Sequence, residues 1–333
     1  MLDKSPVITI GLPVYNGENH IEEAILSVLA QTNTNFKLNI SDNCSTDDTK
    51  KIVDKYLNKD SRISYFRQSE NVGGLKNWLS LTQNISTPYF MWFAHDDTME
   101  SRFLETCIQA LDTRPDIDMA FTVIRNIDIN GKSIREYPEF HKLPFNSNLL
   151  TLIKYIFSAE YDGKANAIYS IYRSNVIYKA FQEDRHQLES PFGDICFLFS
   201  ILASGKNAYI AQEILFNKRA FQEPNQIGHK LQVPKSYFDR SPSPPVFYSQ
   251  KQHFNDAIRK NNRSCLLSIA FEIRYLYLLT PILNRRVRHH LNLSISRIAL
   301  KLKIIRDGTM RLLLPVGHKI PGLRKLYRYF LKK

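Results

Sequence analysis

Residues 7–17 read VITIGLPVYNG, a short apolar and β-branched run interrupted by Gly11 and Pro13. A run of this kind, stopped by turn residues, predicts a buried β-strand. Residues 18–30 follow with apolar side chains at helical spacing and predict an amphipathic helix. The strand and helix form the first of several such units, because the same alternation continues to about residue 93.

Three further strands continue the pattern. They are expected at residues 36–40, 63–66 and 89–93, and Ser45 or Thr46 is expected to cap the helix that follows the first of them. Strands that alternate with helices predict an α/β fold, with a mostly parallel sheet covered by helices on both faces. Ligands of such sheets bind beyond the carboxyl ends of the strands. The polar residues that follow each strand are therefore expected on one rim.

Two adjacent acids, Asp96 and Asp97, follow the apolar strand expected at residues 89–93. Neighbouring carboxylates repel each other unless a cation joins them. Their oxygens suit a hard divalent ion such as Mn²⁺ or Mg²⁺, which commonly also binds phosphate oxygens of a substrate. The same acids would suit a structural role, capping a helix that starts near Ser101. The residues alone leave both interpretations open.

Four segments in this order resemble the family 2 glycosyltransferases of the GT-A fold. They are ITIGLPVYNG at 8–17, ISDNCSTD at 40–47, NVGG at 71–74 and WFAHDD at 92–97. The resemblance covers roughly residues 5–220 and is densest before residue 100. It implies a GT-A type nucleotide-binding sheet with flanking helices, and a hexosyltransferase activity that moves a sugar from a nucleoside-diphosphate donor to a hydroxyl acceptor with inversion.

The resemblance also implies a binding site. The implied nucleotide-binding residues are Pro13, Tyr15, Asp42 and Asp96, with a UDP-sugar as the favoured donor. Asp96 and Asp97 would hold the metal ion, while Ala94 stands where the family has its first metal-motif acid and His95 is a spacer. Asp42 has a second interpretation, as a turn residue that caps the helix after it. We favour the nucleotide role, because Ser45 or Thr46 can supply that cap.

Inverting transfer needs a base that accepts the proton of the acceptor hydroxyl. The family places this base at the start of a helix about a hundred residues after the metal motif, a position that Asp194 matches before the apolar residues 195–203. A simple helix cap is the alternative role for Asp194. Nearby acids compete for the assignment: Glu183, Asp184 and Glu189. Asn166 and Arg173, in the strand-like stretch 165–173, are candidates to reach the acceptor or the diphosphate, and residues 218–228 are a candidate closing loop.

Positive charge is concentrated at the C-terminal end. Lys and Arg stand at 14 positions between 285 and 333, against one acid, so this segment carries the whole net charge of +13. Interleaved apolar residues make it a basic amphipathic region, which predicts docking on an anionic membrane surface. We found no signal peptide and no apolar run of the roughly 18 to 20 residues that a spanning helix needs. We therefore expect a cytoplasmic protein, peripheral at the inner face of the membrane.

The predicted organisation has three parts. They are a GT-A domain at 1–225, divided into a nucleotide-binding half at 1–100 and an acceptor half at 101–225, then a linker and helical extension at 226–284, and a mainly helical basic tail at 285–333. The expected partners are a nucleotide-sugar donor, a lipid-linked or cell-surface glycan acceptor and the anionic membrane. No nucleic acid is expected.

Several alternatives were weighed. A glycoside hydrolase would place its two carboxylates about 5 to 10 Å apart across a sugar, whereas Asp96 and Asp97 are adjacent. A nucleic-acid binder could use tail aromatics such as Tyr327 and Phe330 to stack on bases, yet the rest of the chain is neutral. A catalytically inactive nucleotide-binding protein would tolerate Ala94. A processive synthase is disfavoured, because the chain lacks a Gln-x-x-Arg-Trp motif.

Overall fold

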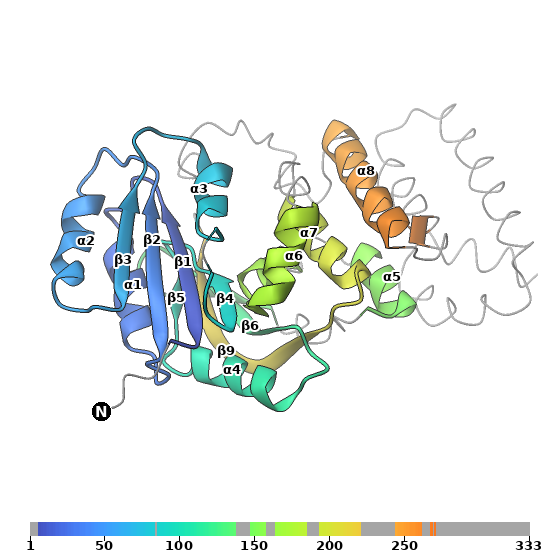
Figure 1. Ribbon diagram of the computed structural model, residues 1–333, viewed down its shortest axis with the longest axis horizontal. Coiled ribbons are helices and arrows are strands. Elements are labelled where there is room, and N and C mark those ends of the chain that lie inside the picture. The colour runs from blue at the N-terminus through green and yellow to red at the C-terminus, as the bar shows by residue number, and fades with distance from the viewer. Residues whose placement is uncertain are drawn as a thin grey trace, which may run out of the picture.

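The computed structural model describes residues 6–83, 85–137, 147–157, 164–184, 193–220, 244–261, 267–268 and 270. Within them, nine strands join into one sheet flanked by helices (Figure 1). The strands are β1 (Ile8–Val14), β2 (Phe36–Asp42), β3 (Ile63–Arg67), β4 (Tyr89–Trp92), β5 (Thr98–Met99), β6 (Met119–Ile127), β7 (Ser133–Glu136), β8 (Ile171–Arg173) and β9 (Ala208–Arg219). The helices are α1 (Ile21–Leu29), α2 (Thr49–Leu57), α3 (Gly74–Ser80), α4 (Phe103–Thr113), α5 (Leu149–Phe157), α6 (Ser174–Asp184), α7 (Gly193–Ala203) and α8 (Pro244–Lys260), with the 3-10 helix η3 (Lys164–Tyr169).

The strand order across the sheet is β3-β2-β1-β4-β8-β6-β9-β5, and β7 pairs with β6. The first four strands are parallel, whereas β8 runs antiparallel to both of its neighbours. The chain steps outward from β1 to β3 and then returns across the sheet to β4. Right-handed crossovers therefore place α1 and α2 on one face and α3 on the other. The predicted α/β fold with parallel strands and flanking helices is confirmed.

One stretch differs from the sequence prediction. Residues 165–173, expected to be strand-like, form η3 followed by the short strand β8. Hydroxyl groups hold the η3 turn, because Ser170 Oγ and Tyr172 Oη donate hydrogen bonds to the carbonyl of Ala167 at 2.7 and 3.0 Å. These side-chain bonds replace the strand ladder that the apolar residues suggested.

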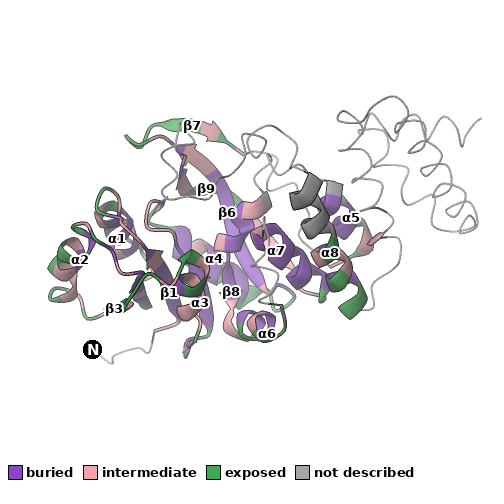
Figure 2. Ribbon diagram, turned by 90° about the horizontal axis from the view of Figure 1, so that it is seen from above, coloured by how far each residue is buried: buried purple, intermediate pink, exposed green. Residues whose placement is uncertain are grey.

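The core lies in the central strands. In β1 the side chains of Ile8, Ile10 and Leu12 are fully buried, and in β4 so are those of Met91 and its neighbours (Figure 2). Burial of consecutive β4 residues follows from helices covering both faces of a parallel sheet. Trp92 packs flat on Trp78 of α3, with ring centroids 3.9 Å apart, and its indole N–H donates to the Trp78 carbonyl. These contacts fix α3 against the strand that leads to Asp96.

Helix α7 is apolar on every side, and apart from Asp194 all of its residues are buried. Tyr155 of α5 donates a hydrogen bond to the carbonyl of Ile195 at 3.0 Å, and Phe199 stacks on Phe254 of α8 at 4.2 Å between centroids. Because neighbouring elements pack against a helix that is buried on all sides, they fix its position in the fold. Its first turn, which carries Asp194, is therefore held rigidly.

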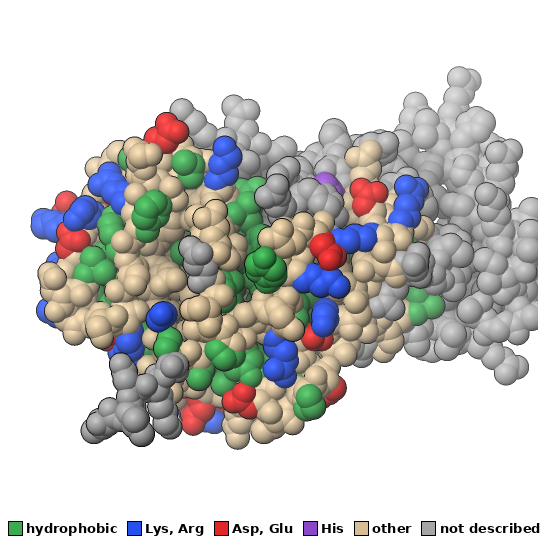
Figure 3. Space-filling view, in the orientation of Figure 1, with side chains coloured by type: hydrophobic (Ala, Val, Ile, Leu, Met, Phe, Trp, Pro, Cys, Tyr) green, Lys and Arg blue, Asp and Glu red, His purple; other side chains and the backbone are tan. Residues whose placement is uncertain are grey.

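The described surface carries both signs of charge, as Figure 3 shows for one face. On α2, for example, Lys50 pairs with Asp54 and Lys51 with Asp48. This mixture agrees with the neutral balance of residues 1–284. None of the described helices is both long and apolar enough to cross a bilayer. The basic tail at 285–333 lies outside the described residues, and its structure stays a prediction.

Candidate active site

The carboxyl ends of β1, β2, β3 and β4 meet at one rim, because these strands are parallel neighbours. Each strand leads into a segment that carries residues of one of the four motifs, and these segments are residues 15–18, 42–49, 68–73 and 94–97. We call the first two of these segments the hydrogen-bonded loops. The rim predicted from the strand and helix alternation is thus present, with all four segments on it.

The two hydrogen-bonded loops are joined by their own polar groups. The Asn16 N–H donates to Ser45 Oγ at 2.9 Å, and Asn16 Oδ1 accepts the Thr46 N–H at 2.8 Å. Gly17 N–H donates to Thr49 Oγ1 at 2.8 Å. Asn16 adopts a left-handed backbone, with φ of 50°, which asparagine tolerates better than most residues. The motif residues therefore shape each other before any ligand binds.

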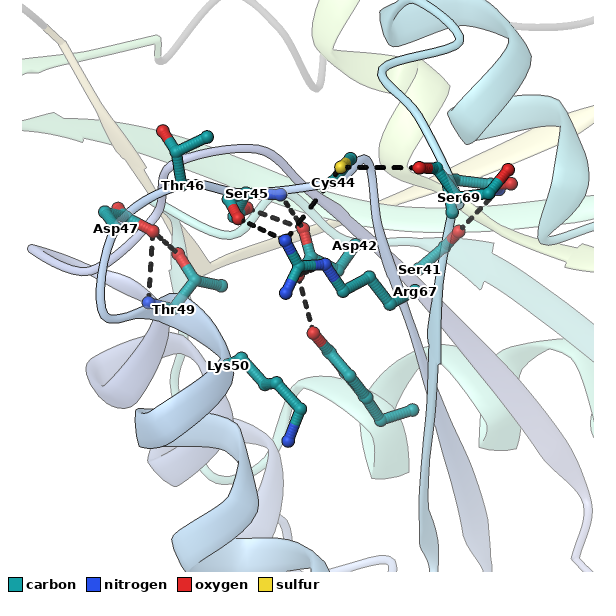
Figure 4. A network of polar contacts seen from close by, with 12 residues as sticks. Ser41, Asp42, Cys44, Ser45, Thr46, Asp47, Thr49, Lys50, Arg67 and Ser69 are labelled. Atoms are coloured by element: carbon teal, nitrogen blue, oxygen red, sulfur yellow. Dashed lines mark hydrogen bonds and ion pairs between the residues drawn. The ribbon is translucent and has the colours of Figure 1, made fainter.

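Asp42 is fully buried at the end of β2 (Figure 4). Its Oδ1 accepts hydrogen bonds from the N–H and the hydroxyl of Ser45, at 2.8 and 2.5 Å. Its Oδ2 accepts the Tyr65 hydroxyl at 2.5 Å, and the Arg67 guanidinium lies 3.9 Å away. Burial and then the bond to Asp42 raise the pKa of Tyr65 well above its ordinary value. Both carboxylate oxygens are thus occupied by groups of the chain itself.

The predicted cap of α2 is wrong. The helix begins at Thr49, after Asp48, and has no side-chain hydrogen bond at its cap, because the Ser45 hydroxyl donates to Asp42 instead. The argument that Ser45 or Thr46 frees Asp42 for the nucleotide therefore does not hold. Base recognition by Asp42 stays a prediction, and it would require its present hydrogen bonds to rearrange.

The third segment is tied to the second. Asn43 Nδ2 donates to Asn71 Oδ1 at 2.8 Å, and Asn43 Oδ1 accepts the Val72 N–H at 2.9 Å. Asn77 of α3 donates to the carbonyl of Ser41 at 2.8 Å and accepts the Ser41 hydroxyl at 2.7 Å. These paired amide bonds position the Gly73 turn beside the end of β2.

Pro13 and Tyr15 are half-buried at the end of β1. Pro13 lies opposite Ser41 in the parallel register of β1 and β2. Both residues therefore lie at the rim with part of their surface exposed, as a base or ribose contact requires. Their predicted contact with the nucleotide stays a prediction.

Asp96 and Asp97 have different surroundings. Asp97 is 1% exposed, its Oδ1 accepts the Arg219 N–H at 2.9 Å, and its Oδ2 is buried with no hydrogen-bond partner among the described residues. Asp96 is half-buried, and its carboxylate accepts no hydrogen bond from the described residues. Burial, followed by the charge of Asp96, raises the pKa of Asp97 well above its ordinary value. An unpartnered buried carboxylate oxygen is costly unless a ligand satisfies it.

This pair fits a divalent cation. The orphan Oδ2 of Asp97 and the open carboxylate of Asp96 are hard oxygen donors on adjacent residues. Over the described residues, no group of three or more His, Cys, Asp or Glu side chains is arranged to hold a metal. Mg²⁺ is commonly bound by one or two carboxylates together with substrate phosphates and water. Two acids are therefore sufficient for a metal that arrives with its nucleotide.

Arg219, the last residue of β9, ties the acids to the rest of the fold. Its Nε donates to the carbonyl of Asp96 at 3.0 Å, and its Nη1 donates to the carbonyls of Asp128 and Ile129. Its Nη2 pairs with Glu23 of α1 at 2.5 Å. The Arg219 side chain is 1% exposed, so its guanidinium is buried and contacts other parts of the fold. Sequence reasoning placed Lys218 and Arg219 in a closing loop; they lie in β9 instead, and residues 221–228 lie outside the described ones.

His95 is a packing residue. A Cβ atom added to Gly17 would lie 2.8 Å from His95 Cδ2 and 2.6 Å from Val14 Cγ2, closer than two such atoms can approach. Gly17 therefore lets the His95 ring pack on the loop after β1. This contact holds the acid-bearing loop beside the first of the hydrogen-bonded loops.

Asp194 lies in the first turn of α7, half-buried, and accepts the Ile195 N–H at 2.8 Å. Burial raises the pKa of Tyr169, and the charges of Asp97, Asp96 and Asp194 raise it further. All three acids therefore lie near this tyrosine. Lys218 Nζ lies 5.3 Å from the centroid of the Tyr169 ring. We call Asp96, Asp97, Tyr169, Asp194 and Lys218 the acidic cluster.

The competing candidates have other surroundings. Glu183 is an exposed residue that pairs with Lys260 of α8 at 3.0 Å. Arg173 donates to the carbonyls of Ile117 and Leu111 at 2.9 and 2.6 Å, which gives it a structural role. Asn166 does lie at the site, because its Oδ1 accepts a hydrogen bond from Lys218. Glu189 and the side chain of Asp184 lie outside the described residues.

Comparison with known sequences finds one family. The family model described as Glycosyl transferase family 2 matches residues 9–176, half of the chain. An uncharacterized glycosyltransferase of Rickettsia felis is 33% identical over 155 residues, which cover 44% of this chain and 24% of that protein. The match thus spans about a quarter of the length of this relative.

Solved structures share the fold. S. aureus TarS in complex with UDP superposes with a TM-score of 0.57 at 16% identity, covering 84% of this chain and 76% of TarS. The mannosyltransferase PcManGT of Pyrobaculum calidifontis, in complex with GDP-Man and Mn²⁺, gives 0.53 at 13% identity, with 97% and 83% covered. At these identities the likeness establishes a GT-A type architecture.

Proposed function

The chain belongs to glycosyl transferase family 2, and from this premise we propose that it moves one sugar from a nucleoside-diphosphate sugar to a hydroxyl group. The donor is a UDP-sugar, the acceptor is a lipid-linked or cell-surface glycan, and the anomeric configuration is inverted. TarS in complex with UDP and PcManGT in complex with GDP-Man have the same fold. The nucleotides bound to these two proteins support a nucleoside-diphosphate sugar as the donor. Because one is a uridine and the other a guanosine nucleotide, the base that this chain prefers is to be measured.

One observation carries the proposal. The acidic cluster combines the half-buried Asp96 and the buried Asp97 with a third acid, Asp194, on the buried helix α7. Asp97 Oδ2 is buried with no hydrogen-bond partner among the described residues. A buried acid with a raised pKa, next to a second acid at the rim of an α/β sheet, is typical of a catalytic site.

The reaction assigns a separate role to each acid. As the acceptor oxygen attacks the anomeric carbon, Asp194 takes the hydroxyl proton, the new carbon–oxygen bond forms and the bond to the diphosphate breaks. The electron pair leaves on the diphosphate oxygen. Attack from the face opposite the leaving group inverts the anomeric carbon.

Asp96 and Asp97 would hold a divalent ion, Mn²⁺ or Mg²⁺, which when bound supplies charge neutralisation for the diphosphate. Arg219 keeps these acids in place through the Asp96 carbonyl and Asp97 Oδ1. The hydrogen-bonded loops hold Pro13 and Tyr15 at the same rim for the base and ribose. Each part of the site therefore has one task.

A panel of nucleotide sugars tests the proposal. The full chain is incubated with UDP-, GDP- and dTDP-sugars in Mn²⁺ or in EDTA, and both nucleotide binding and slow donor hydrolysis are measured. We expect one donor to bind and to release its nucleoside diphosphate only with the metal. Binding without hydrolysis or transfer would identify an inactive nucleotide-binding protein, and binding of no donor would refute the proposal. With an acceptor in hand, proton NMR of the product anomer tests inversion.

We further propose that the basic tail at 285–333 docks the enzyme on the anionic inner face of the membrane. Its support is the charge of +13 carried among apolar residues, since each basic residue near anionic lipid contributes on the order of 1 kcal/mol. Sedimentation with anionic and neutral liposomes, at low and high salt, compares the full chain with one ending near Asn284. Binding that ignores lipid charge, or that survives truncation, contradicts docking by the tail.

A further inference from the structure

Two consecutive cations end β9, and they have different surroundings. Arg219 donates four side-chain hydrogen bonds to carbonyls and to Glu23, so its guanidinium is used by the fold. Lys218 is half-buried, and its Nζ donates to Asn166 Oδ1 at 2.8 Å. An ammonium group has three N–H donors. Within the described residues Lys218 therefore keeps donors for a ligand.

The position of Lys218 is fixed from two sides. Asn166 is 6% exposed in η3, and its amide oxygen accepts one ammonium hydrogen. The Tyr169 ring, which itself stacks on Phe216 with centroids 5.6 Å apart, lies 5.3 Å from the ammonium. A cation over an aromatic face is held by electrostatic attraction. The flexible lysine side chain is thus oriented before a ligand arrives.

The charges nearby point to an anionic ligand. The N–H of Arg219, the next residue along β9, donates to Asp97 Oδ1 at 2.9 Å, so Lys218 lies beside the acid-bearing loop. No ion pair within 4.0 Å joins Lys218 to these acids among the described residues. A partly desolvated ammonium without a paired carboxylate gains most from a multiply charged ligand. At the proposed site, the ligand of that kind is the diphosphate.

We propose that Lys218, oriented by Asn166 and Tyr169, binds the diphosphate of the donor and stabilises the negative charge that the leaving group acquires. This inference rests on the proposed function, because it takes the donor to be a nucleoside-diphosphate sugar. Lys218 contributes a positive charge that Asn166 and Tyr169 orient, next to the residue whose N–H donates to Asp97. Fixed charges that meet developing charge in a site shielded from water are among the strongest catalytic contributions.

Calorimetric titration of the full chain with UDP, GDP, UMP and uridine tests the assignment, in Mn²⁺ and in EDTA. Lys218→Met is expected to weaken binding of the preferred nucleoside diphosphate by about ten- to a hundredfold, the usual contribution of hydrogen bonds to charged groups. The nucleoside should bind as it does to the wild type. Lys218→Arg should retain part of the affinity, and Lys218→Gln, which can still donate to Asn166, should lose it.

Lys59→Met is the matched control, since Lys59 is an exposed residue just beyond the far end of α2. Equal diphosphate affinity in Lys218→Met and the wild type overturns the assignment. So does an equal loss in Lys59→Met, which would indicate a general effect of net charge, or an equal loss of nucleoside affinity. If the wild type binds no nucleoside diphosphate, the proposed function fails first. If it binds one and Lys218→Met binds it equally well, only the role of Lys218 fails.

Discussion

The hydrogen-bonded loops and the acidic cluster lie on the same rim, yet they satisfy their polar groups in opposite ways. In the loops, both oxygens of Asp42 accept hydrogen bonds from the chain. In the cluster, among the described residues, Asp97 Oδ2 is buried without a partner and Lys218 has one acceptor, Asn166. The loops satisfy their own polar groups, whereas the cluster leaves polar atoms available to a ligand. We therefore propose that the chemistry takes place at the cluster.

The largest expected effect is at Asp96. Asp96→Ala should reduce transfer to background, about a thousandfold or more, because the open carboxylate that we propose as a metal ligand is lost. Thermal unfolding should be unchanged, since the Asp96 carboxylate makes no hydrogen bond within the described residues. Sugar release from the preferred donor measures the activity. Asp116→Ala, which removes an exposed acid paired with Arg114, is the control. Full activity of Asp96→Ala in EDTA contradicts the metal assignment.

A smaller loss is expected at Asp194. Asp194→Asn should reduce turnover by about a hundredfold to ten-thousandfold, the usual contribution of a general base, with donor affinity nearly unchanged. Steady-state kinetics separates the two quantities. The competing acids provide the comparison: Asp184→Asn, Glu189→Gln and Glu183→Gln. Normal turnover in Asp194→Asn, together with an inactive variant among these three, would move the role to that residue.

The same substitution in the two regions should change stability in opposite directions. Asp42→Asn should lower the free energy of unfolding by about 1.5 to 3 kcal/mol, because an amide cannot accept hydrogen bonds at both ends from Ser45 and Tyr65. Asp97→Asn should leave stability unchanged or raise it, since it removes a buried unpaired charge. Urea unfolding in metal-free buffer measures both. If Asp97→Asn lowers the free energy of unfolding as much as Asp42→Asn does, the Asp97 carboxylate is as fully hydrogen-bonded as that of Asp42.

The smallest expected effect is a pH dependence at Asp47. Burial raises the pKa of this acid, but hydrogen bonds from Thr49 and from the Glu18 N–H together outweigh it and lower the pKa below 3.8. The folded state therefore prefers the ionised form. The stabilisation is present above the unfolded-state pKa and disappears as the pH falls through the folded-state value.

Asp47→Asn should flatten this acid limb of the curve of unfolding free energy against pH. The two proteins should differ most near neutral pH and converge in acid. Asp54→Asn, which removes a half-buried acid of α2 that pairs with Lys50, is the control. A constant difference between Asp47→Asn and the wild type across the range would assign the effect to packing instead of charge.

Much of the rim followed from local pattern. Apolar runs such as residues 7–12 and 89–93, each ended by polar or turn residues, predicted the strands and the rim beyond them. The order of four motifs then indicated the family that the sequence comparison shows. These signals are readable because each depends on residues close together in the chain. The tail at 285–333 was read in the same way, and its docking stays a prediction.

The errors arose where local options compete. Ser45 can cap a helix or bond to an acid three residues earlier, and the sequence does not rank the two. In the folded protein Asp42 is buried against Tyr65, and the Ser45 hydroxyl donates to Asp42 and does not cap the helix. A buried carboxylate is costly unless nearby donors form hydrogen bonds to it. The stretch 165–173 likewise has strand-like composition, but Tyr172 and Ser170 hold its first part as a 3-10 turn.

The sequence by itself indicated the four parallel strands and the rim beyond them, since strand period and turn residues act over a few positions. Its family motifs implied the roles of Asp96, Asp97 and Asp194. Only the tertiary structure decided how that rim is completed. Arg219 reaches Asp97 across 122 positions of chain, and Lys218 reaches Asn166 across 52. No local pattern encodes such pairs, because their geometry exists only after β9 has paired with β6 and α7 has been buried. The physical reason is that hydrogen bonds and charges act through distance in space, whereas pattern is read along the chain.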